Sequence, residues 1–346
     1  MAKAPSVSVI VPARNEEACL GRCLQSLVSQ EGVEFEIIVV DDASTDRTRE
    51  IAQSFPPVNL VSAASVPPGW TGKNNAVWTG AKQARGQWLL FTDADTYHLP
   101  GSLARSVAKA LEHGAALLSY SPRQEVRGLW EKAVMPVIFA ELAVTYRPSQ
   151  VSDPASNVAA ANGQYILVTR EAYDAVGGHA AAGSDLLEDV ALARAVKKSG
   201  RRIYFRYGGD AVRTRMYRSF RQLREGWTKN LALLFPSPLR LAFVRFAEFS
   251  LIMGSAIAAL FVARGHISLA TTCGAVALAL IAVEQLRIRR AHFAWDASLL
   301  SLAGLPMFSY LLWRSQRFHK LGKVTWKGRQ AQRPKQVLAT PHARVS

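Results

Sequence analysis

Three acidic clusters in the chain combine residue types and spacings that could perform chemistry. Asp41-Asp42 and Asp93-Ala94-Asp95 each follow a short apolar run, and Glu188-Asp189 stands just before a helix-like stretch. Carboxylates suit hard cations such as Mg²⁺ or Mn²⁺, which usually bind through one or two carboxylates together with substrate phosphates. A carboxylate beside apolar neighbours, as Asp189 is beside Leu186-Leu187, can serve as a general base because desolvation raises its pKa.

The elements that must position these clusters alternate between strand and helix patterns. Apolar β-branched runs predict strands at 7–11, 35–40, 58–62 and 88–92, and helical periodicity predicts helices at 16–29, from Ser44 or Thr45 to about 55, at 74–85 and at 190–198. Such alternation predicts an α/β fold with a mostly parallel sheet and helices on both faces. Ligands bind at the carboxyl ends of the strands in these sheets, where the first two acidic clusters would lie.

Charge and hydropathy point to a membrane. The formal net charge is +16 and the pI is about 10.1, which suits nucleic acid, an anionic membrane face or a phosphate-bearing substrate. The arginine-rich stretch 201–245 is followed by apolar segments near 241–263, 267–283 and 293–313. A nucleic-acid binder would instead interleave its basic stripe with aromatic residues. We therefore expect an anionic membrane surface as a partner, and no nucleic acid.

The three apolar segments are near the lower length limit of a membrane span. Arg245 and Glu248 interrupt the first and could pair at i,i+3, while Asp296 and Pro306 interrupt the third, which either spans or is re-entrant or interfacial. A bundle of buried helices in a soluble domain is the alternative. The helix predicted at 130–146 is either interfacial or a core helix. We expect three parts: a domain over 1–235, a membrane module of two to three helices over 236–313, and a basic tail over 314–346.

An ordered set of motifs covers roughly the first two-thirds of the chain. It comprises Val7–Glu17, Ile38–Asp46, Gly72–Ala76, Phe91–Asp95, Ala161–Gln164, Val176–His179 and Glu188-Asp189. In this order the set resembles family 2 glycosyltransferases of the GT-A fold. The resemblance implies a GT-A catalytic domain, a nucleotide-sugar donor, with a UDP-sugar expected, and metal-dependent, inverting transfer of a hexose.

The resemblance also implies a role for each matching side chain. Asp42 would accept the N–H of a uracil-type base, Asp95 would hold Mg²⁺ or Mn²⁺ against the donor diphosphate, and Asp189 would be the general base. Asp93 would lie near the ribose or share the metal, and Lys73 would lie near a phosphate. The remaining donor-binding candidates are Pro12, Ala13, Arg14 and Glu16. Structural alternatives are a turn cap at Asp42, a solvated loop at Asp93 and Asp95, and a helix-dipole partner at Asp189.

A downstream box departs from the family pattern. Arg221 and Arg224 match the spacing of a Gln/Arg-x-x-Arg-Trp box near the diphosphate, but Glu225-Gly226 separates Arg224 from Trp227. The stretch Gly226–Asn230 is similar to the hopanoid-associated and carotenoid (diaponeurosporenoate) branches, and more distantly to ceramide glucosyltransferase. This likeness implies a lipid or isoprenoid-type acceptor.

The combined expectation is a multi-pass hexosyltransferase of the cell membrane. Its catalytic domain would be cytoplasmic, because no apolar stretch near the N-terminus is long enough for a signal peptide. A catalytically idle lipid-binding or scaffold protein of the same fold would lack a carboxylate, and none is missing here. A polysaccharide synthase is the other alternative. Such an enzyme usually has an intact Gln/Arg-x-x-Arg-Trp box and membrane spans on both sides of its catalytic domain, and the sequence predicts neither.

Overall fold

A computed structural model describes residues 6–263, 265–326 and 329–330. Its main sheet has the strand order β3-β2-β1-β4-β8-β6-β9. The bounds are β1 (Val7–Ala13), β2 (Phe35–Asp41), β3 (Val58–Ser62), β4 (Trp88–Phe91), β6 (Leu117–Ser121), β8 (Ile166–Thr169) and β9 (Ile203–Tyr207). Strands β3, β2, β1 and β4 are parallel, and β8 is antiparallel to both β4 and β6. The predicted mostly parallel α/β sheet is therefore confirmed.

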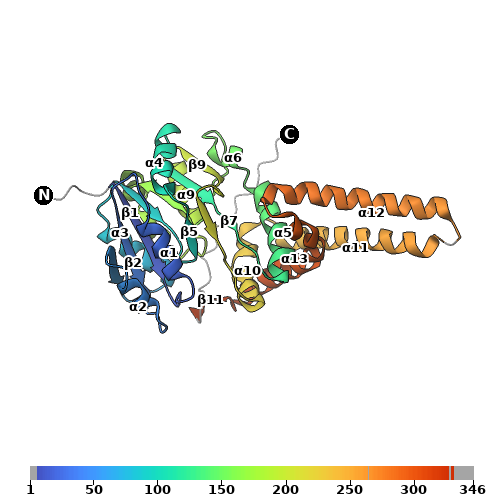
Figure 1. Cartoon of the computed structure of the whole chain (residues 1–346), viewed down its shortest axis with the longest axis horizontal. Helices are drawn as coiled ribbons and strands as arrows, with labels where there is room; N and C mark the ends of the chain where they lie inside the picture. The colour runs from blue at the N-terminus through green and yellow to red at the C-terminus, as the bar shows by residue number, and fades with distance from the viewer. Residues whose placement is uncertain (1–5, 264, 327–328, 331–346) are drawn as a thin grey trace.

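Helices cover both faces of this sheet (Figure 1). Side chains alternate across a strand, so Val9 and Val11 of β1 pack on one face and Ile10 on the other. The first face is covered by α1 (Leu20–Val28), α2 (Thr48–Gln53) and α4 (Ser102–Glu112). The second is covered by α3 (Gly72–Gln83), α7 (Arg170–Ala175) and α9 (Glu188–Lys198), with α6 (Pro148–Ser152) beside β9 and α8 (Gly178–Ala181) beside α3.

A second, smaller sheet has the strand order β5-β10-β7. Its strands are β5 (Thr96–His98), β7 (Arg123–Gln124) and β10 (Val212–Thr214), and β10 is antiparallel to β5 and parallel to β7. This pairing brings the arginine-rich chain after 212 next to the loop that follows β4. A separate two-stranded ladder joins β11 (Thr325–Trp326) and β12 (Arg329–Gln330).

A third core lies between α5 (Leu129–Thr145), α10 (Phe220–Leu234) and α13 (Trp295–Leu321). Ile138, Leu231 and Phe308 are among its buried side chains. Gly304 of α13 lies so close to the backbone of Ala133 in α5 that a Cβ there would collide with it. The third apolar segment thus packs against α5 and α10, its Asp296 pairs with Lys132 of α5 at 2.6 Å, and Pro306 lies within the helix. Most of the basic tail predicted over 314–346 lies outside the described residues.

The first two apolar segments form a long helical hairpin that projects away from the rest of the fold (Figure 1). It consists of α11 (Pro238–Val262) and α12 (Ile267–Ile288), with the short turn η1 (Arg289–Ala291) after it. Within the described residues, the stretches 238–262 and 267–291 are the two that are long and apolar enough to cross a membrane. Large apolar side chains such as Phe243, Leu260 and Phe261 are 74%, 77% and 82% exposed.

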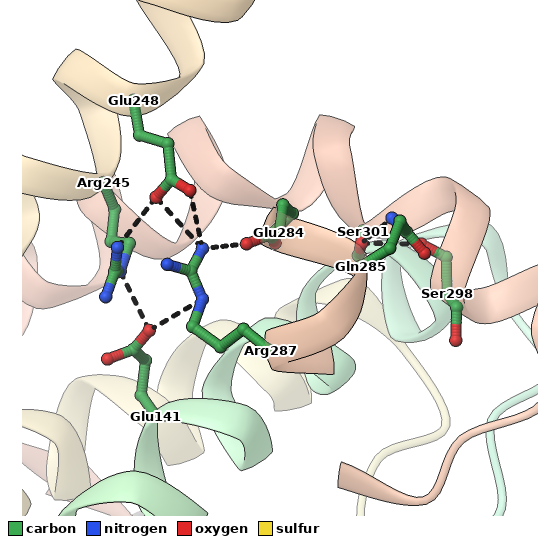
Figure 2. Close-up of polar contacts among 8 residues, drawn as sticks. All are labelled: Glu141, Arg245, Glu248, Glu284, Gln285, Arg287, Ser298 and Ser301. Carbon is green, nitrogen blue, oxygen red and sulfur yellow. Dashed lines mark hydrogen bonds and ion pairs between the residues drawn. The ribbon is translucent and has the colours of Figure 1, made fainter. Parts of the chain in front are cut away.

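A cluster of charged side chains joins the base of this hairpin to α5 (Figure 2). Glu141 of α5 lies 2.8 Å from Arg245 Nε and 3.4 Å from Arg287 Nε. Glu248 forms ion pairs with both guanidinium groups, with Arg245 at 2.7 Å and with Arg287 at 3.0 Å. Glu284 also pairs with Arg287. The predicted Arg245–Glu248 pair is therefore present, as part of a larger network. Because the side chains of this network are largely buried, each charge needs its partners to offset desolvation.

We expect Arg287→Ala to destabilise the docking of the hairpin on α5. The substitution leaves Glu284, which is fully buried, without its cation, while Glu141 and Glu248 keep Arg245 alone. Breaking a buried pair in this way costs about 3–5 kcal/mol. Thermal unfolding of the full chain in detergent micelles measures the loss, with exposed Arg289→Ala as the matched control. Equal unfolding temperatures for the two variants would show that the network does not hold the hairpin.

Candidate active site

A cavity of about 670 Å³ opens where the carboxyl ends of β1, β2 and β4 meet. Eight predicted site residues line it: Pro12, Ala13, Arg14, Glu16, Asp42, Lys73, Asp93 and Asp95. Parallel strands bring their carboxyl ends to one edge, which is why residues far apart in sequence converge there. A cavity therefore lies at the edge of the sheet where the sequence predicts ligand binding.

The end of the cavity near β1 and β2 contains Asp42. Asp41 occupies the turn instead: its Oδ1 accepts a hydrogen bond from Ser44 N at 3.1 Å, so the Asp42 side chain is directed to the cavity. Arg14 Nη1 donates to the Asp42 carbonyl oxygen at 2.6 Å and fixes this loop. The next helix, predicted from Ser44 or Thr45, begins at Thr48, whose N–H donates to Asp46 Oδ1 at 3.0 Å. Asp41 and Asp46, rather than Asp42, therefore accept the side-chain hydrogen bonds of this turn.

Hydrogen bonds to the backbone hold the acidic loop after β4. Thr96 Oγ1 donates to the Asp93 carbonyl oxygen at 2.7 Å, and Thr214 Oγ1 donates to that of Asp95 at 3.2 Å. Burial lowers the pKa of the neighbouring His98 to about 3, so this histidine is neutral. The loop is thus fixed through its main chain, which leaves the carboxylates of Asp93 and Asp95 at the cavity wall.

Lys73 connects the acidic loop to the start of α9. Its Nζ lies 2.8 Å from Asp93 Oδ1 and 2.8 Å from Glu188 Oε1. Asp189 lies beside this trio, where Oδ2 accepts a hydrogen bond from Gly163 N at 2.9 Å. A Cβ on Gly163 would come within 3.1 Å of Lys73 Nζ, a tight contact that a larger residue could relieve only by displacing the lysine side chain. Asn162-Gly163-Gln164 therefore fixes the base candidate.

The two adjacent carboxylates of α9 have opposite electrostatic settings. Burial and the neighbouring Glu188 carboxylate raise the pKa of Asp189. Although burial acts against ionisation of Glu188 too, the ammonium of Lys73 lowers its pKa below the ordinary range. Environments that separate the pKa values of two neighbouring carboxyls are how acid and base roles are assigned in many sites. Asp189 is therefore the better proton acceptor, although Glu188 is the one that lines the main cavity.

The cavity suits a divalent cation bound together with a substrate. Asp93 and Asp95 both line this cavity, and Mg²⁺ commonly binds to one or two carboxylates of a protein. Among the described residues, no group of three or more His, Cys, Asp or Glu side chains could hold a metal alone. The donor set therefore fits a cation that is completed by phosphate oxygens.

Four predicted site residues do not line this cavity: Asp189, which lines a smaller adjoining pocket, and Arg221, Arg224 and Trp227 of α10. Gly226, Lys229 and Asn230 of α10 face it at the i, i+3, i+4 spacing, so Arg221 and Arg224 lie on the other side of the helix. Trp227 is buried in the third core, where its Nε1 donates to Met135 Sδ at 3.3 Å. Contact of Arg221 and Arg224 with a diphosphate stays a prediction.

The structure adds cavity residues that the sequence did not single out. Trp70, Tyr217, Lys229 and Asn230 all line it. Lys229 and Asn230 belong to the stretch Gly226–Asn230, whose likeness to one branch of the family was the available signal. Burial lowers the pKa of Lys229, and the nearby Glu188 carboxylate opposes that shift.

The fold and site define a GT-A domain of the nucleotide-sugar transferase type. The chain is 19% identical to a mannosyltransferase from Pyrobaculum calidifontis, solved in complex with GDP-Man and Mn²⁺, with a TM-score of 0.53 over 92% of this chain and 87% of that one. This likeness shows the fold.

The glycosyl transferase family 2 model matches residues 8–177, so this part of the chain is a domain of that family. It is 31% identical over 232 residues to 4,4'-diaponeurosporenoate glycosyltransferase of Staphylococcus aureus (strain USA300), covering 66% of this chain. The chain spans about 61% of the length of the curated relatives it matches.

We expect Lys73→Met to destabilise the protein most near neutral pH. The lowered pKa of Glu188 stabilises the fold above the ordinary carboxyl range, and that contribution disappears as pH falls and Glu188 is protonated. The loss should be about 1–3 kcal/mol at pH 7, since Lys73 is partly exposed, and smaller near pH 4. Denaturant unfolding at both pH values measures it, with exposed Lys198→Met on α9 as control. A loss independent of pH would contradict this role of Lys73.

Proposed function

We propose that this protein transfers a hexose from a UDP-sugar to a lipid or isoprenoid-type acceptor at the membrane, with inversion at the anomeric carbon. The observation that supports this most is that Asp42, Asp93, Asp95 and Glu188 line one cavity, while Asp189 lines a small adjoining pocket that Asp93 and Glu188 also line. These groups come from separate elements, yet they supply a base acceptor, cation ligands and a proton acceptor.

The donor would lie along the cavity from Asp42 to Glu188. Asp42 would accept the uracil N–H, with Pro12, Ala13, Arg14 and Glu16 around the nucleoside. Asp93 would lie near the ribose or share the cation held by Asp95. Mg²⁺ or Mn²⁺, when bound, would supply positive charge that stabilises the leaving diphosphate. Lys73 is already held between two carboxylates, so its part would be to position Asp93 and Glu188.

Asp189 would act as the general base. The acceptor hydroxyl gives its proton to Asp189, its oxygen forms a bond to the anomeric carbon, and the bond from that carbon to the diphosphate breaks. Attack and departure on opposite faces of the sugar invert the centre. The raised pKa of Asp189 suits this task, because a more basic carboxylate takes up the proton of the acceptor hydroxyl more readily.

The hairpin would place this reaction at the bilayer. α11 and α12 expose apolar side chains over lengths that can cross a hydrocarbon core, and the strongly basic chain would favour an anionic surface. The catalytic domain would then be cytoplasmic. The Staphylococcus aureus relative has 4,4'-diaponeurosporenoate in its name, which supports a lipid-like acceptor.

Asp189→Asn should separate catalysis from donor binding. The amide keeps the size of the side chain but cannot accept the proton, so UDP-glucose should bind nearly as before while transfer falls about 10²–10⁴-fold. Asp42→Asn should instead weaken UDP binding, because the acceptor for the base is altered. Calorimetry with UDP and mass spectrometry of hexosylated membrane lipids measure the two effects.

Glu188→Gln is the matched comparison for this test. If Glu188→Gln abolishes transfer while Asp189→Asn retains it with UDP bound, Glu188 is the base. If no variant changes any hexosylated lipid, and cells lacking the gene show the same lipids, the proposed transferase activity is wrong.

Metal removal gives an independent test. Asp95→Ala should abolish donor turnover, and a chelator should do the same to the unsubstituted protein, with Mg²⁺ or Mn²⁺ restoring activity. The physical reason is that the leaving diphosphate would lack its stabilising charge. Hydrolysis of UDP-glucose by the purified full chain is the assay. Full turnover in excess chelator would overturn the role assigned to Asp95.

A further inference from the structure

A second, smaller cavity lies on the far side of the acidic loop. It has a volume of about 270 Å³ and is bounded by α1, β5, the start of the chain into α5, and the residues after β10. Asp95 lines both this cavity and the larger one, and it is the single residue they share. The small cavity therefore adjoins the cation-binding end of the donor site.

Five arginines line this cavity, against two carboxylates. The arginines are Arg22, Arg127, Arg213, Arg215 and Arg218, and the carboxylates are Asp95 and Glu125. Such an excess of guanidinium groups repels cations and attracts oxyanions, which guanidinium groups bind through paired N–H donors.

Several of these guanidinium groups already have a partner. Glu125 lies 3.4 Å from Arg22 and 3.8 Å from Arg127, and Arg22 also lies over the Tyr97 ring. Glu131, which is buried, takes Arg215 at 2.9 Å. These pairs fix three walls of the cavity and leave its positive charge incompletely neutralised.

Arg213 and Arg218 have no such partner. Among the residues that the structure describes, no carboxylate lies within 4.0 Å of either guanidinium group. The Nε of Arg213 is buried and has no hydrogen-bond acceptor. A buried guanidinium N–H without an acceptor is costly, so this position favours a ligand that supplies one.

An apolar lip adjoins the arginines. Leu129 and Trp130, just after Arg127, are 69% and 51% exposed. The Trp130 ring contacts that of Phe220, two residues after Arg218, with centroids 5.6 Å apart. The lip therefore joins both sides of the cavity mouth. It also forms the first turn of α5, the helix whose Glu141 connects to the base of the hairpin (Figures 1 and 2).

We propose that this arginine pocket binds the oxyanion head group of an amphiphile, with its apolar tail over Leu129 and Trp130. This inference rests on the proposed function, since the amphiphile would be the acceptor held next to the donor. The combination of Arg213 and Arg218 with exposed apolar side chains matches a ligand that has an anionic head group and an apolar tail. The acceptor class is thereby narrowed to lipids that have a carboxylate or phosphate head.

The donor diphosphate is a poorer occupant. The larger cavity already contains Lys229 beside Asp93 and Asp95, and the two cavities have a single residue in common. A pocket of about 270 Å³ also has room for a head group but not for a nucleotide-sugar.

Decyl phosphate tests the pocket with the full chain in phosphatidylcholine nanodiscs. Calorimetry, corrected with empty nanodiscs, should show saturable binding that is tighter than that of inorganic phosphate, and UDP should not displace it. Arg218→Met and Arg213→Met should each weaken it about tenfold to a hundredfold, as expected for a lost charged hydrogen bond. Arg240→Met, which removes an exposed arginine at the start of α11, should leave it unchanged.

Other outcomes would overturn the inference. Equal binding by Arg218→Met and the unsubstituted protein excludes the pocket, and an equal loss in Arg240→Met would mean that only general membrane charge acts. Displacement by UDP would assign the arginines to the donor, and inorganic phosphate binding as tightly as decyl phosphate would exclude the tail. UDP binding by every variant is the check on folding. If the unsubstituted protein fails to bind UDP, the proposed function fails, whereas the result with decyl phosphate still decides the pocket.

Discussion

The ammonium of Lys73 is the interaction on which the arrangement of the candidate active site depends. Asp93, Glu188 and Asp189 come from two distant parts of the chain and meet at the wall of the cavity, where their negative charges repel each other. Lys73, 2.8 Å from both Asp93 and Glu188, offsets that repulsion and joins α3, the loop after β4 and the start of α9. Because the cation stabilises ionised Glu188, and burial and the Glu188 carboxylate raise the pKa of Asp189, Asp189 is the stronger proton acceptor of the two. One lysine thus determines both the geometry and the order of ionisation.

A second constraint connects this site to the hairpin through α5. Near its start, Glu131 pairs with Arg215 at the wall of the arginine pocket, and Lys132 pairs with Asp296 of α13 at 2.6 Å. Near its end, Glu141 receives Arg245 and Arg287 at the base of α11 and α12 (Figure 2). The Glu131 and Glu141 carboxylates are buried, so each needs its arginine partner, and the pairs restrict how α5 can be oriented on the neighbouring elements. The helix therefore fixes the site relative to the part of the chain that is most apolar.

Local sequence patterns were sufficient for much of the fold. The β-branched runs before Asp41 and Asp93 form strands because their side chains fill both faces of a buried sheet, and the parallel order follows from the helices between them. The same patterns place Asp42, Asp93 and Asp95 at one edge, so most of the donor side of the cavity could be predicted. The start of α2 was misjudged because Asp46, rather than Ser44 or Thr45, accepts the N–H at the first turn. Side-chain hydrogen bonds at helix ends depend on the local backbone path, which residue types alone leave open.

The sequence by itself determined which residue types reach the sheet edge and which stretches are apolar enough to leave water. Tertiary structure alone decided what those residues face. Trp227 belongs to a core because α5 and α13 cover that side of α10, and Arg221 and Arg224 turn away from the cavity for the same reason. It also decided that Lys73 pairs with carboxylates, that the third apolar segment packs against α5, and that Arg213 and Arg218 share a pocket with an apolar lip. Periodicity and hydropathy are properties of neighbouring residues, whereas a pocket or an ion pair depends on distances between residues that the chain separates by tens of positions.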